Sequence, residues 1–304
     1  MPNQTKKLIS IVGPTAIGKT ALGIQIAQHF GTEIISADSR QFYREISIGT
    51  AKPNSQELKA VKHHFINSHS VNDLVSVGSF ETEALSVIEE LFKTDNIVVM
   101  VGGSGLYVKA VLEGFDKLPS VNESFRNQLN KELQDFGIGK LQDELLESDP
   151  IYFEQIDIHN PQRIIRALEV FRSTGNTFSS YRTNKKVERN FNVLKIGLNT
   201  SRKILYNRVN LRVDEMMQNG LLEEVVSVKA YQHSNALKTV GYTELFDYLD
   251  GNIDLLSAIE LIKQNTRRFA KRQLTWFRRD EEIHWFDSSD NTILTQIPAL
   301  LMQG

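Results

Sequence analysis

The sequence contains no cysteine, and this absence excludes several kinds of site. Disulfide bonds, thiolate nucleophiles and cysteine-ligated zinc all depend on that side chain. A chain without cysteine suits a reducing compartment, so we expect a cytoplasmic protein.

Long apolar runs are also missing. No run approaches the roughly 18 apolar residues that a membrane-spanning helix requires. The first ten residues, MPNQTKKLIS, lack the apolar centre of a signal peptide. We therefore expect no membrane association.

Neither sign of charge dominates the chain. Its 304 residues include 35 Lys and Arg against 37 Asp and Glu, a formal net charge of −2. Overall charge does not indicate a nucleic-acid partner, so any basic surface for one must be local. The length allows one large domain or two modest ones.

Strands of continuous apolar residues alternate with helices near the start of the chain. Strands are expected in KKLISIVG, EIISADS and NIVVMVGG, and apolar residues recur at helical spacing in TALGIQIAQHF and LYVKAVLEG. This alternation predicts an α/β fold with a parallel sheet covered on both faces. Ligands bind beyond the carboxyl ends of such strands, where the loop 13–20, Asp38 and the loop 102–104 would converge.

The character of the chain changes between about Pro119 and Lys195. This segment is polar and helical, with one amphipathic stretch in LNKELQDFGIGKLQDELLESDP and another in PQRIIRALEVFRSTG. Strand character returns at VLKIGLNT, and helical patterns fill the remainder. We predict a P-loop NTPase-like core of residues 1–117 and 196–304, with an all-helical domain inserted at 118–195.

The strongest motif is a complete phosphate loop, Gly13-x4-Gly18-Lys19-Thr20, between a predicted strand and a predicted helix. Backbone N–H groups of such a loop hold a diphosphate, the lysine adds charge and the Thr20 hydroxyl can ligate Mg²⁺. The motif indicates diphosphate without specifying a nucleotide. The residues predicted to bind it are Gly13, Pro14, Thr15, Ala16, Ile17, Gly18, Lys19 and Thr20.

Asp38 ends the second predicted strand, in ISADSRQFY. An aspartate there is commonly a turn or helix-capping residue. At a strand end that faces a phosphate loop, a catalytic or metal-binding role is equally reasonable. The pattern alone leaves both interpretations open.

Several segments in order from about Ile11 to Phe286 together resemble the tRNA dimethylallyltransferase family in its bacterial form. They are GPTAIGKT, ISADSRQFYREISIGTAKP, VVMVGGSGLYVKAVLEG, NPQRIIRALEVFRSTG, LYNRVNLRVDEMMQNGLLEEV and AKRQLTWFRRDEEIHWF. The resemblance implies a prenyltransferase that moves a dimethylallyl group from its diphosphate to N6 of adenosine 37 of tRNA, using Mg²⁺. We expect it to act as a monomer.

The implied reaction assigns catalytic roles to four residues. Asp38 would accept the proton of the adenine amine, while Lys19 and Arg212 would stabilise the departing diphosphate. Ser104 stands where the family usually has threonine and keeps the hydroxyl. Arg208 and Arg212 share one helix face, where a solvated salt-bridge surface is the alternative. We favour Arg212 for the diphosphate and include Arg208 in the donor site.

Local positive charge is present despite the acidic total. Seven basic and no acidic residues lie from Lys263 to Arg279, interleaved with Phe269 and Trp276. A second basic run is Arg182, Lys185, Lys186 and Arg189. Such runs are often only solvated surface, but two of them favour contact with an RNA backbone.

By resemblance, the tRNA anticodon stem-loop would contact four groups of residues. These are Asp38, Ser39, Arg40 and Gln41; Ser104 and Arg126; Gln162, Arg163, Ile164, Ile165 and Arg166; and Lys238, Thr239, Val240, Gly241 and Tyr242.

Two other functions are compatible with a phosphate loop. A small-molecule kinase usually has an acidic Mg²⁺ partner after an apolar strand, but glycines follow VVMV in this chain. A nucleotide-dependent switch protein would need no transfer chemistry. These alternatives remain open at the level of the motif.

Overall fold

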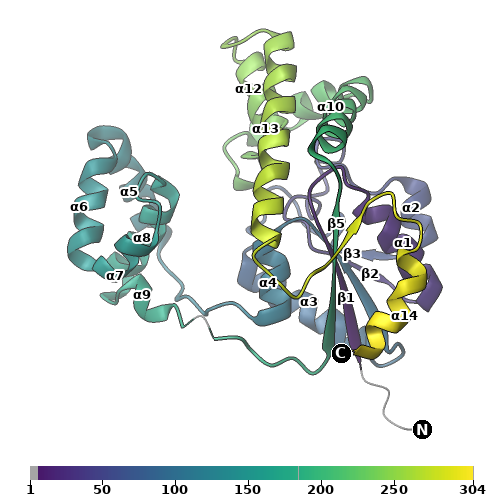
Figure 1. The fold of residues 1–304 in the computed structure, drawn as a ribbon. Helices are drawn as coiled ribbons and strands as arrows, with labels where there is room; N and C mark the ends of the chain where they lie inside the picture. Colours follow the sequence, from purple (N-terminus) through teal and green to yellow (C-terminus); the bar gives the residue numbers. More distant parts are fainter. Residues whose placement is uncertain (1–5, 184, 304) are drawn as a thin grey trace. The chain divides into compact units, whose positions relative to one another are not determined.

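The structure is a computed structural model that describes residues 6–183 and 185–303. Its centre is a six-stranded sheet in which every paired strand is parallel (Figure 1). The strand order is β3 (His63–His64), β2 (Ile34–Ser36), β4 (Ile97–Val101), β1 (Lys7–Val12), β5 (Asn192–Asn199) and β6 (His284–Asp287). The predicted parallel α/β architecture is confirmed.

Alternate residues of β1 enter two different hydrophobic clusters, which places one on each face of the sheet. Leu8 packs with residues of α3 (Val77–Leu91) and α4 (Gly105–Glu113). Ile9 packs with residues of α1 (Lys19–Phe30), α10 (Arg202–Gln218) and α14 (Ile293–Gln303). Both faces are therefore covered, which explains why the strands read as continuous apolar runs.

The remaining helices of this unit are α2 (Ser55–Ala60), α11 (Leu221–Ser227), α12 (Tyr242–Leu249) and α13 (Leu255–Phe277). Two 3-10 turns, Lys229–Tyr231 and Asn235–Leu237, connect α11 to α12. No helix in the described part of the chain is long and apolar enough to cross a membrane.

The chain divides into two compact units, residues 1–113 with 188–304, and residues 114–187. The second unit contains α5 (Glu123–Phe136), α6 (Ile138–Ser148), α7 (Pro150–Gln155), α8 (Pro161–Thr174) and α9 (Phe178–Tyr181). The predicted boundary at residue 195 lies too late, because β5 begins at Asn192 and pairs with β1.

In the second unit, one stretch that was predicted as a single helix forms two helices. The stretch LNKELQDFGIGKLQDELLESDP was predicted as a single amphipathic element, but it is divided between α5 and α6 at Gly137. Gly137 has a φ of 76°, a conformation that ends α5 at little cost only in glycine. Leu129, Leu141, Leu145, Ile164 and Ile165 from three helices then form a separate core.

An ion-pair network joins the helices of this unit. Arg172 on α8 donates to Glu132 on α5 at 2.8 and 3.0 Å, and also pairs with Glu144 on α6. Lys140 lies 3.1 Å from the same Glu132 carboxylate. Hydrogen bonds from Arg172 lower the pKa of Glu132 to about 2.

The low pKa of Glu132 predicts that the helical unit loses stability in acid. Because the folded-state pKa lies below the ordinary 4.5, the Glu132 interactions stabilise the fold above pH 4.5. That stability, at most about 3 kcal/mol, is lost as the pH falls toward about 2. Glu132→Gln should thus be less stable than wild type at pH 7, and the difference should vanish near pH 2. Urea unfolding of the full chain, followed by far-UV circular dichroism, measures it.

Glu154→Gln, at an exposed position on α7, is the matched control and should unfold like wild type at every pH. A Glu132→Gln difference that stays constant from pH 7 to pH 2 would contradict the assignment of the pH dependence to this carboxylate.

Candidate functional site

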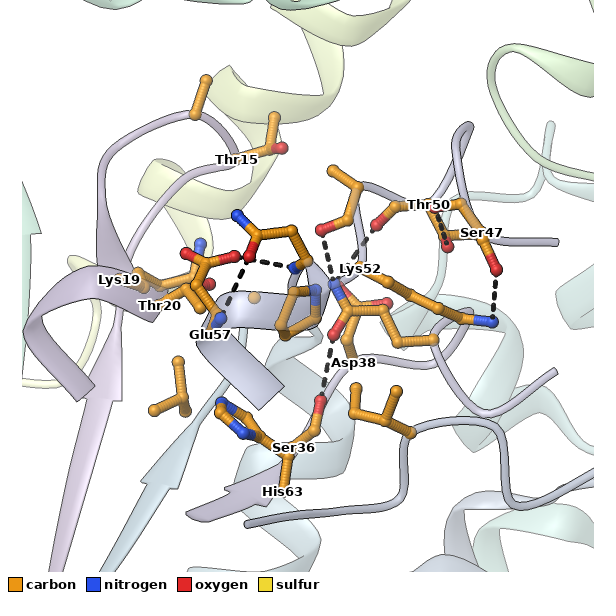
Figure 2. Close-up of a pocket in the computed structure, with 18 of the residues that line it drawn as sticks. Thr15, Lys19, Thr20, Ser36, Asp38, Ser47, Thr50, Lys52, Glu57 and His63 are labelled. Carbon is orange, nitrogen blue, oxygen red and sulfur yellow. Dashed lines mark hydrogen bonds between the residues drawn. The ribbon is translucent and has the colours of Figure 1, made fainter. Parts of the chain in front are cut away.

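A cavity of about 850 Å³ lies in the first unit at the carboxyl ends of β1, β2 and β4 (Figure 2). It is lined by Thr15 to Thr20 of the phosphate loop, by Asp38 and Gln41, by residues 47, 48 and 50–55, and by Gly102 and Gly103. Arg212 from α10 and Gln273 from α13 complete the wall. The three strand ends that the sequence predicted to converge do meet here.

The phosphate loop has a backbone that only particular residues adopt easily. Gly13 and Gly18 have φ angles of 142° and 103°. A Cβ on Gly13 would also lie 2.6 Å from the carbonyl oxygen of Leu198, so the position requires glycine. Gly18 precedes α1, whose first residues Lys19 and Thr20 therefore present free N-terminal amides beside the cavity. The loop is thus already arranged as an anion site.

Lys19 carries the main positive charge of this loop. Its Nζ donates to the Pro14 carbonyl oxygen at 2.7 Å. Burial lowers the pKa of Lys19 to about 7, the Asp38 carboxylate acts in the opposite direction, and Arg212 lowers the pKa further. A bound anion would favour the protonated lysine, so ligand binding and protonation are coupled.

The two arginines of α10 have different surroundings. Arg212 Nη1 donates to the Thr15 hydroxyl at 3.3 Å, and Arg212 lines the cavity. Burial lowers the pKa of its guanidinium, and the Glu215 and Glu57 carboxylates offset part of this effect. Arg208 instead donates to Ser288 Oγ at 2.9 Å and is not part of the cavity wall. The geometry favours Arg212 over Arg208 as the diphosphate ligand.

Asp38 makes a turn bond and also faces the cavity, so its position suits both interpretations that the sequence left open. One oxygen, Oδ1, accepts the Arg40 backbone amide at 2.9 Å, as in a turn. The carboxylate also lines the cavity and influences Lys19. Because a carboxylate has further lone pairs, the turn leaves capacity to accept a proton from a ligand.

Ser104 is tied to the chain beside Asp38. Its hydroxyl accepts the Ser39 amide at 3.0 Å and donates to Ser39 Oγ at 3.2 Å. Ser104 does not line the cavity, although Gly102 and Gly103 before it do. These bonds indicate a supporting position for Ser104 next to the aspartate.

Sequence reasoning missed the loop that forms one wall of the cavity. Glu224 on α11 accepts the amides of Ser47, Ile48 and Gly49 at 2.7, 2.8 and 3.0 Å. The Tyr242 hydroxyl donates to the same carboxylate at 2.6 Å. Glu224 therefore holds this wall, and only the spatial arrangement reveals it because the partners are about 176 positions apart.

Lys52 and Gln41 fix the same loop from its other side. Lys52 Nζ donates to the Tyr43 carbonyl and to Asn67 Oδ1 at 2.6 Å, and burial lowers its pKa to about 8. Gln41 Nε2 donates to the carbonyls of Thr50 and Ala51 at 3.2 and 3.1 Å. The segment IGTAKP, which belongs to one of the stretches that carry the family resemblance, thus forms much of this wall.

Several residues expected to contact RNA have buried side chains. Tyr242 is fully buried and bonded to Glu224, while Ile164 and Ile165 belong to the core of the helical unit. Their side chains cannot reach RNA in this structure, which corrects those three expectations. Arg126 and Arg166 both pair with the buried Glu169.

The other residues expected to contact RNA differ in their exposure to solvent. Gln162, Arg163 and Lys238 are exposed, whereas Ser39, Arg40, Thr239 and Val240 are half-buried and Gly241 is buried before α12. Arg40 donates to the carbonyl oxygen of Asn235 at 2.7 Å. The exposed side chains are the ones that remain available to a large ligand.

A family model described as IPP transferase matches residues 41–280 of the chain. The chain is 54% identical to the tRNA dimethylallyltransferase of Christiangramia forsetii over 285 residues, 94% of each protein. It is 48% identical to tRNA dimethylallyltransferase 1 of Bacteroides fragilis over 295 residues, covering 97% of this chain and 98% of the relative. The resemblance drawn from the sequence is confirmed.

Comparison with solved structures leads to the same family. The full-length tRNA isopentenylpyrophosphate transferase of Bacillus halodurans matches with a TM-score of 0.73 and 37% identity, over 98% of this chain and 97% of that one. A eukaryotic dimethylallyltransferase acting on tRNA matches with a TM-score of 0.75 and 27% identity, over 98% of this chain and 77% of that one.

The pKa of Lys19 leads to a prediction for binding of inorganic diphosphate to the cavity. Only the protonated lysine attracts the anion, so its contribution is full below pH 7 and declines above it. Lys19→Met should weaken binding about 10–100-fold at pH 6, a typical loss for a charged hydrogen bond, and much less at pH 9. Calorimetry in buffers of different ionisation enthalpy should also detect proton uptake in the wild type near pH 8.

Lys62→Met is the control, because Lys62 is exposed and paired with Glu33 away from the cavity wall. Equal diphosphate affinity of the wild type and Lys19→Met at pH 6 would show that the loop does not bind the anion.

Proposed function

The chain belongs to the IPP transferase family, and we propose that it transfers a dimethylallyl group from dimethylallyl diphosphate to N6 of adenosine 37 in tRNA, next to the anticodon. Diphosphate is the other product. The observation that carries the proposal is that one cavity holds both a diphosphate cradle at Lys19 and a carboxylate at Asp38. A prenyl transfer to an amine requires both.

The donor half of the reaction uses the phosphate loop. As the allylic C–O bond breaks, the bonding electron pair leaves with the diphosphate, and its negative charge grows. Lys19, the amides at the start of α1 and Arg212 face this charge, and such prearranged groups stabilise it most in a water-poor site. Apolar side chains in the cavity wall, including Ile34, Leu58 and Val101, would receive the prenyl tail and exclude water.

The acceptor half uses Asp38. The exocyclic amine of adenine is a weak nucleophile because its lone pair is delocalised into the ring. The N6–C1 bond forms as the C1–O bond breaks, and Asp38 takes the proton that the amine loses. Ser104 and Ser39 hold the backbone next to this carboxylate.

The residues present fit a magnesium ion held mainly by the substrate. No group of three or more His, Cys, Asp or Glu side chains suited to a metal occurs among residues 6–183 and 185–303. Mg²⁺ commonly keeps water ligands and binds through substrate phosphates with few protein ligands. The Thr20 hydroxyl at the cavity would supply one such ligand, and the bound ion would neutralise diphosphate charge.

Exposed cations offer a surface for the tRNA backbone. On α13, Arg268, Lys271 and Arg272 are exposed, as are Arg278 and Arg279 directly after the helix. Phe269 lines the cavity with 38% of its surface exposed, so a base beside the target adenine can stack on its ring. In the helical unit, Gln162 and Arg163 are exposed on α8.

Two basic residues of the run 182–189 already make contacts within the protein. Arg189 donates to the carbonyls of Ala110 and Val111 and to Glu81, while Arg182 lies over the Tyr152 ring at 5.4 Å. Lys185 is exposed and remains a candidate for a phosphate contact.

A small-molecule kinase would usually have an acidic metal ligand directly after an apolar strand, but Gly102 occupies that place after β4. A Cβ on Gly102 would lie 2.3 Å from the Ala37 carbonyl oxygen, so no acidic side chain fits there. A tRNA substrate supports a cytoplasmic location, and action as a monomer stays a prediction.

Asp38→Asn tests the proton acceptor. Asn keeps the oxygen that accepts the Arg40 amide, so the turn and the fold should survive. It cannot take a proton at neutral pH, and single-turnover transfer should fall by about 10²–10⁴, the usual value of a general base. Affinity for tRNA and the melting temperature should change little. A stable variant within about tenfold of the wild-type rate would refute the base assignment.

Arg163→Glu tests the RNA surface of the helical unit. If Arg163 contacts a phosphate, tRNA affinity should fall, and the slope of log affinity against log salt should decrease by about one. Lys131→Glu makes the same charge change at an exposed position of α5 and should have a smaller effect. Binding of the donor should be unchanged in both. Identical tRNA affinities of the two variants would remove Arg163 from the footprint.

A further inference from the structure

Gln273 is one of the few polar side chains of α13 that are buried, with 6% of its surface exposed. Its Oε1 accepts the backbone amide of Thr15 in the phosphate loop at 2.8 Å. Its Nε2 donates to the carbonyl oxygen of Gly103, after β4, at 2.9 Å. One amide side chain therefore joins the two loops that meet at the cavity.

We propose that Gln273 is a positioning residue that sets the distance between the diphosphate cradle and the aspartate that accepts the proton. This inference rests on the proposed prenyl transfer.

The first half of the connection fixes the donor loop. Thr15 is held twice, at its amide by Gln273 and at its hydroxyl by Arg212. The next residue, Ala16, has a φ of 62°, which is unfavourable for a side chain with a Cβ. A fixed Thr15 amide helps to hold this strained turn in the conformation that presents Lys19.

The second half fixes the acceptor side. Gly103 is followed by Ser104, whose hydroxyl bonds to the amide and hydroxyl of Ser39. Gly102 packs closely against Ala37, so the segments on both sides of Asp38 are tied to the loop that Gln273 holds. A shift of the Gly103 carbonyl would therefore move Asp38.

Transfer chemistry is sensitive to such a shift. The amine nitrogen and the allylic carbon must approach to about 3–3.5 Å, and a misplacement of about 1 Å can cost roughly 10²-fold in rate. Binding of either substrate alone depends much less on this distance. Loss of Gln273 should thus reduce kcat more than affinity.

The first test is Gln273→Leu, which removes both hydrogen bonds. We expect kcat for transfer to fall about 10–100-fold, with dissociation constants for the donor and for tRNA within about threefold of wild type. Asn265→Leu is the matched control: Asn265 lies on the same helix, its Nδ2 donates to the buried Glu244 at 2.7 Å, and it does not line the cavity. The control should lower the melting temperature and leave kcat near wild type.

The second test is Gln273→Glu, measured against wild type from pH 5.5 to pH 8. An ionised glutamate still accepts the Thr15 amide but cannot donate to the Gly103 carbonyl. A protonated glutamic acid restores both bonds. Burial and the Gly103 carbonyl oxygen favour this protonated form, whereas the nearby Lys19 ammonium favours the ionised form, so a lower pH is needed to restore the second bond. We therefore expect the variant's kcat, relative to wild type at each pH, to recover at least fivefold as the pH falls.

The outcomes separate the inference from the proposed function. A wild-type enzyme that does not prenylate tRNA would overturn the function itself. A working wild type with Gln273→Leu no slower than Asn265→Leu, or with its loss found entirely in substrate affinity, would overturn the positioning role. A pH-independent ratio for Gln273→Glu would overturn it as well, because that variant leaves the Thr15 bond in place.

Discussion

Burial of the Lys19 ammonium group is the constraint around which the cavity is organised. Removing a charge from water costs several kcal/mol unless partners offset it, and the depressed pKa of about 7 reflects that cost. Asp38 offsets part of the cost and Arg212 adds to it, so the positive charge of Lys19 is only partly balanced. An anionic ligand relieves this imbalance. In the proposed reaction, the ammonium group that binds the diphosphate therefore also favours a highly charged donor.

The features that the sequence predicted correctly are those with a local physical cause. β1, β2, β4 and β5 were recognisable because a strand buried on both faces is continuously apolar. β3 has only two residues and β6 is partly exposed, so neither produces that pattern. The division of α5 from α6 depends on one glycine in a left-handed conformation, which periodicity does not detect. The phosphate loop and its setting were predictable because its function is encoded in consecutive residues.

The parts of the site that were missed depend on distant partners. Gln273 and Thr15 are 258 positions apart, and Glu224 holds a loop about 176 positions away. Tyr242 shows the opposite error. A family resemblance associated it with RNA, yet its full burial and its bond to Glu224 show that it supports the cavity wall. Some residues shared by a family support the site and others touch the ligand. Burial of the side chain identifies the supporting ones.

The position of the helical insertion has a consequence for synthesis of the chain. β1 lies between β4 and β5, and Lys7 pairs with Asn192. After β4 is made, the ribosome must complete the whole insertion before β5 exists, a delay of roughly 5–18 s at about 5–20 residues per second. During that interval β1 is an edge strand with unpaired backbone groups, the kind of edge that invites aggregation. The second unit has its own core and can therefore form while this edge of the nascent sheet is still open.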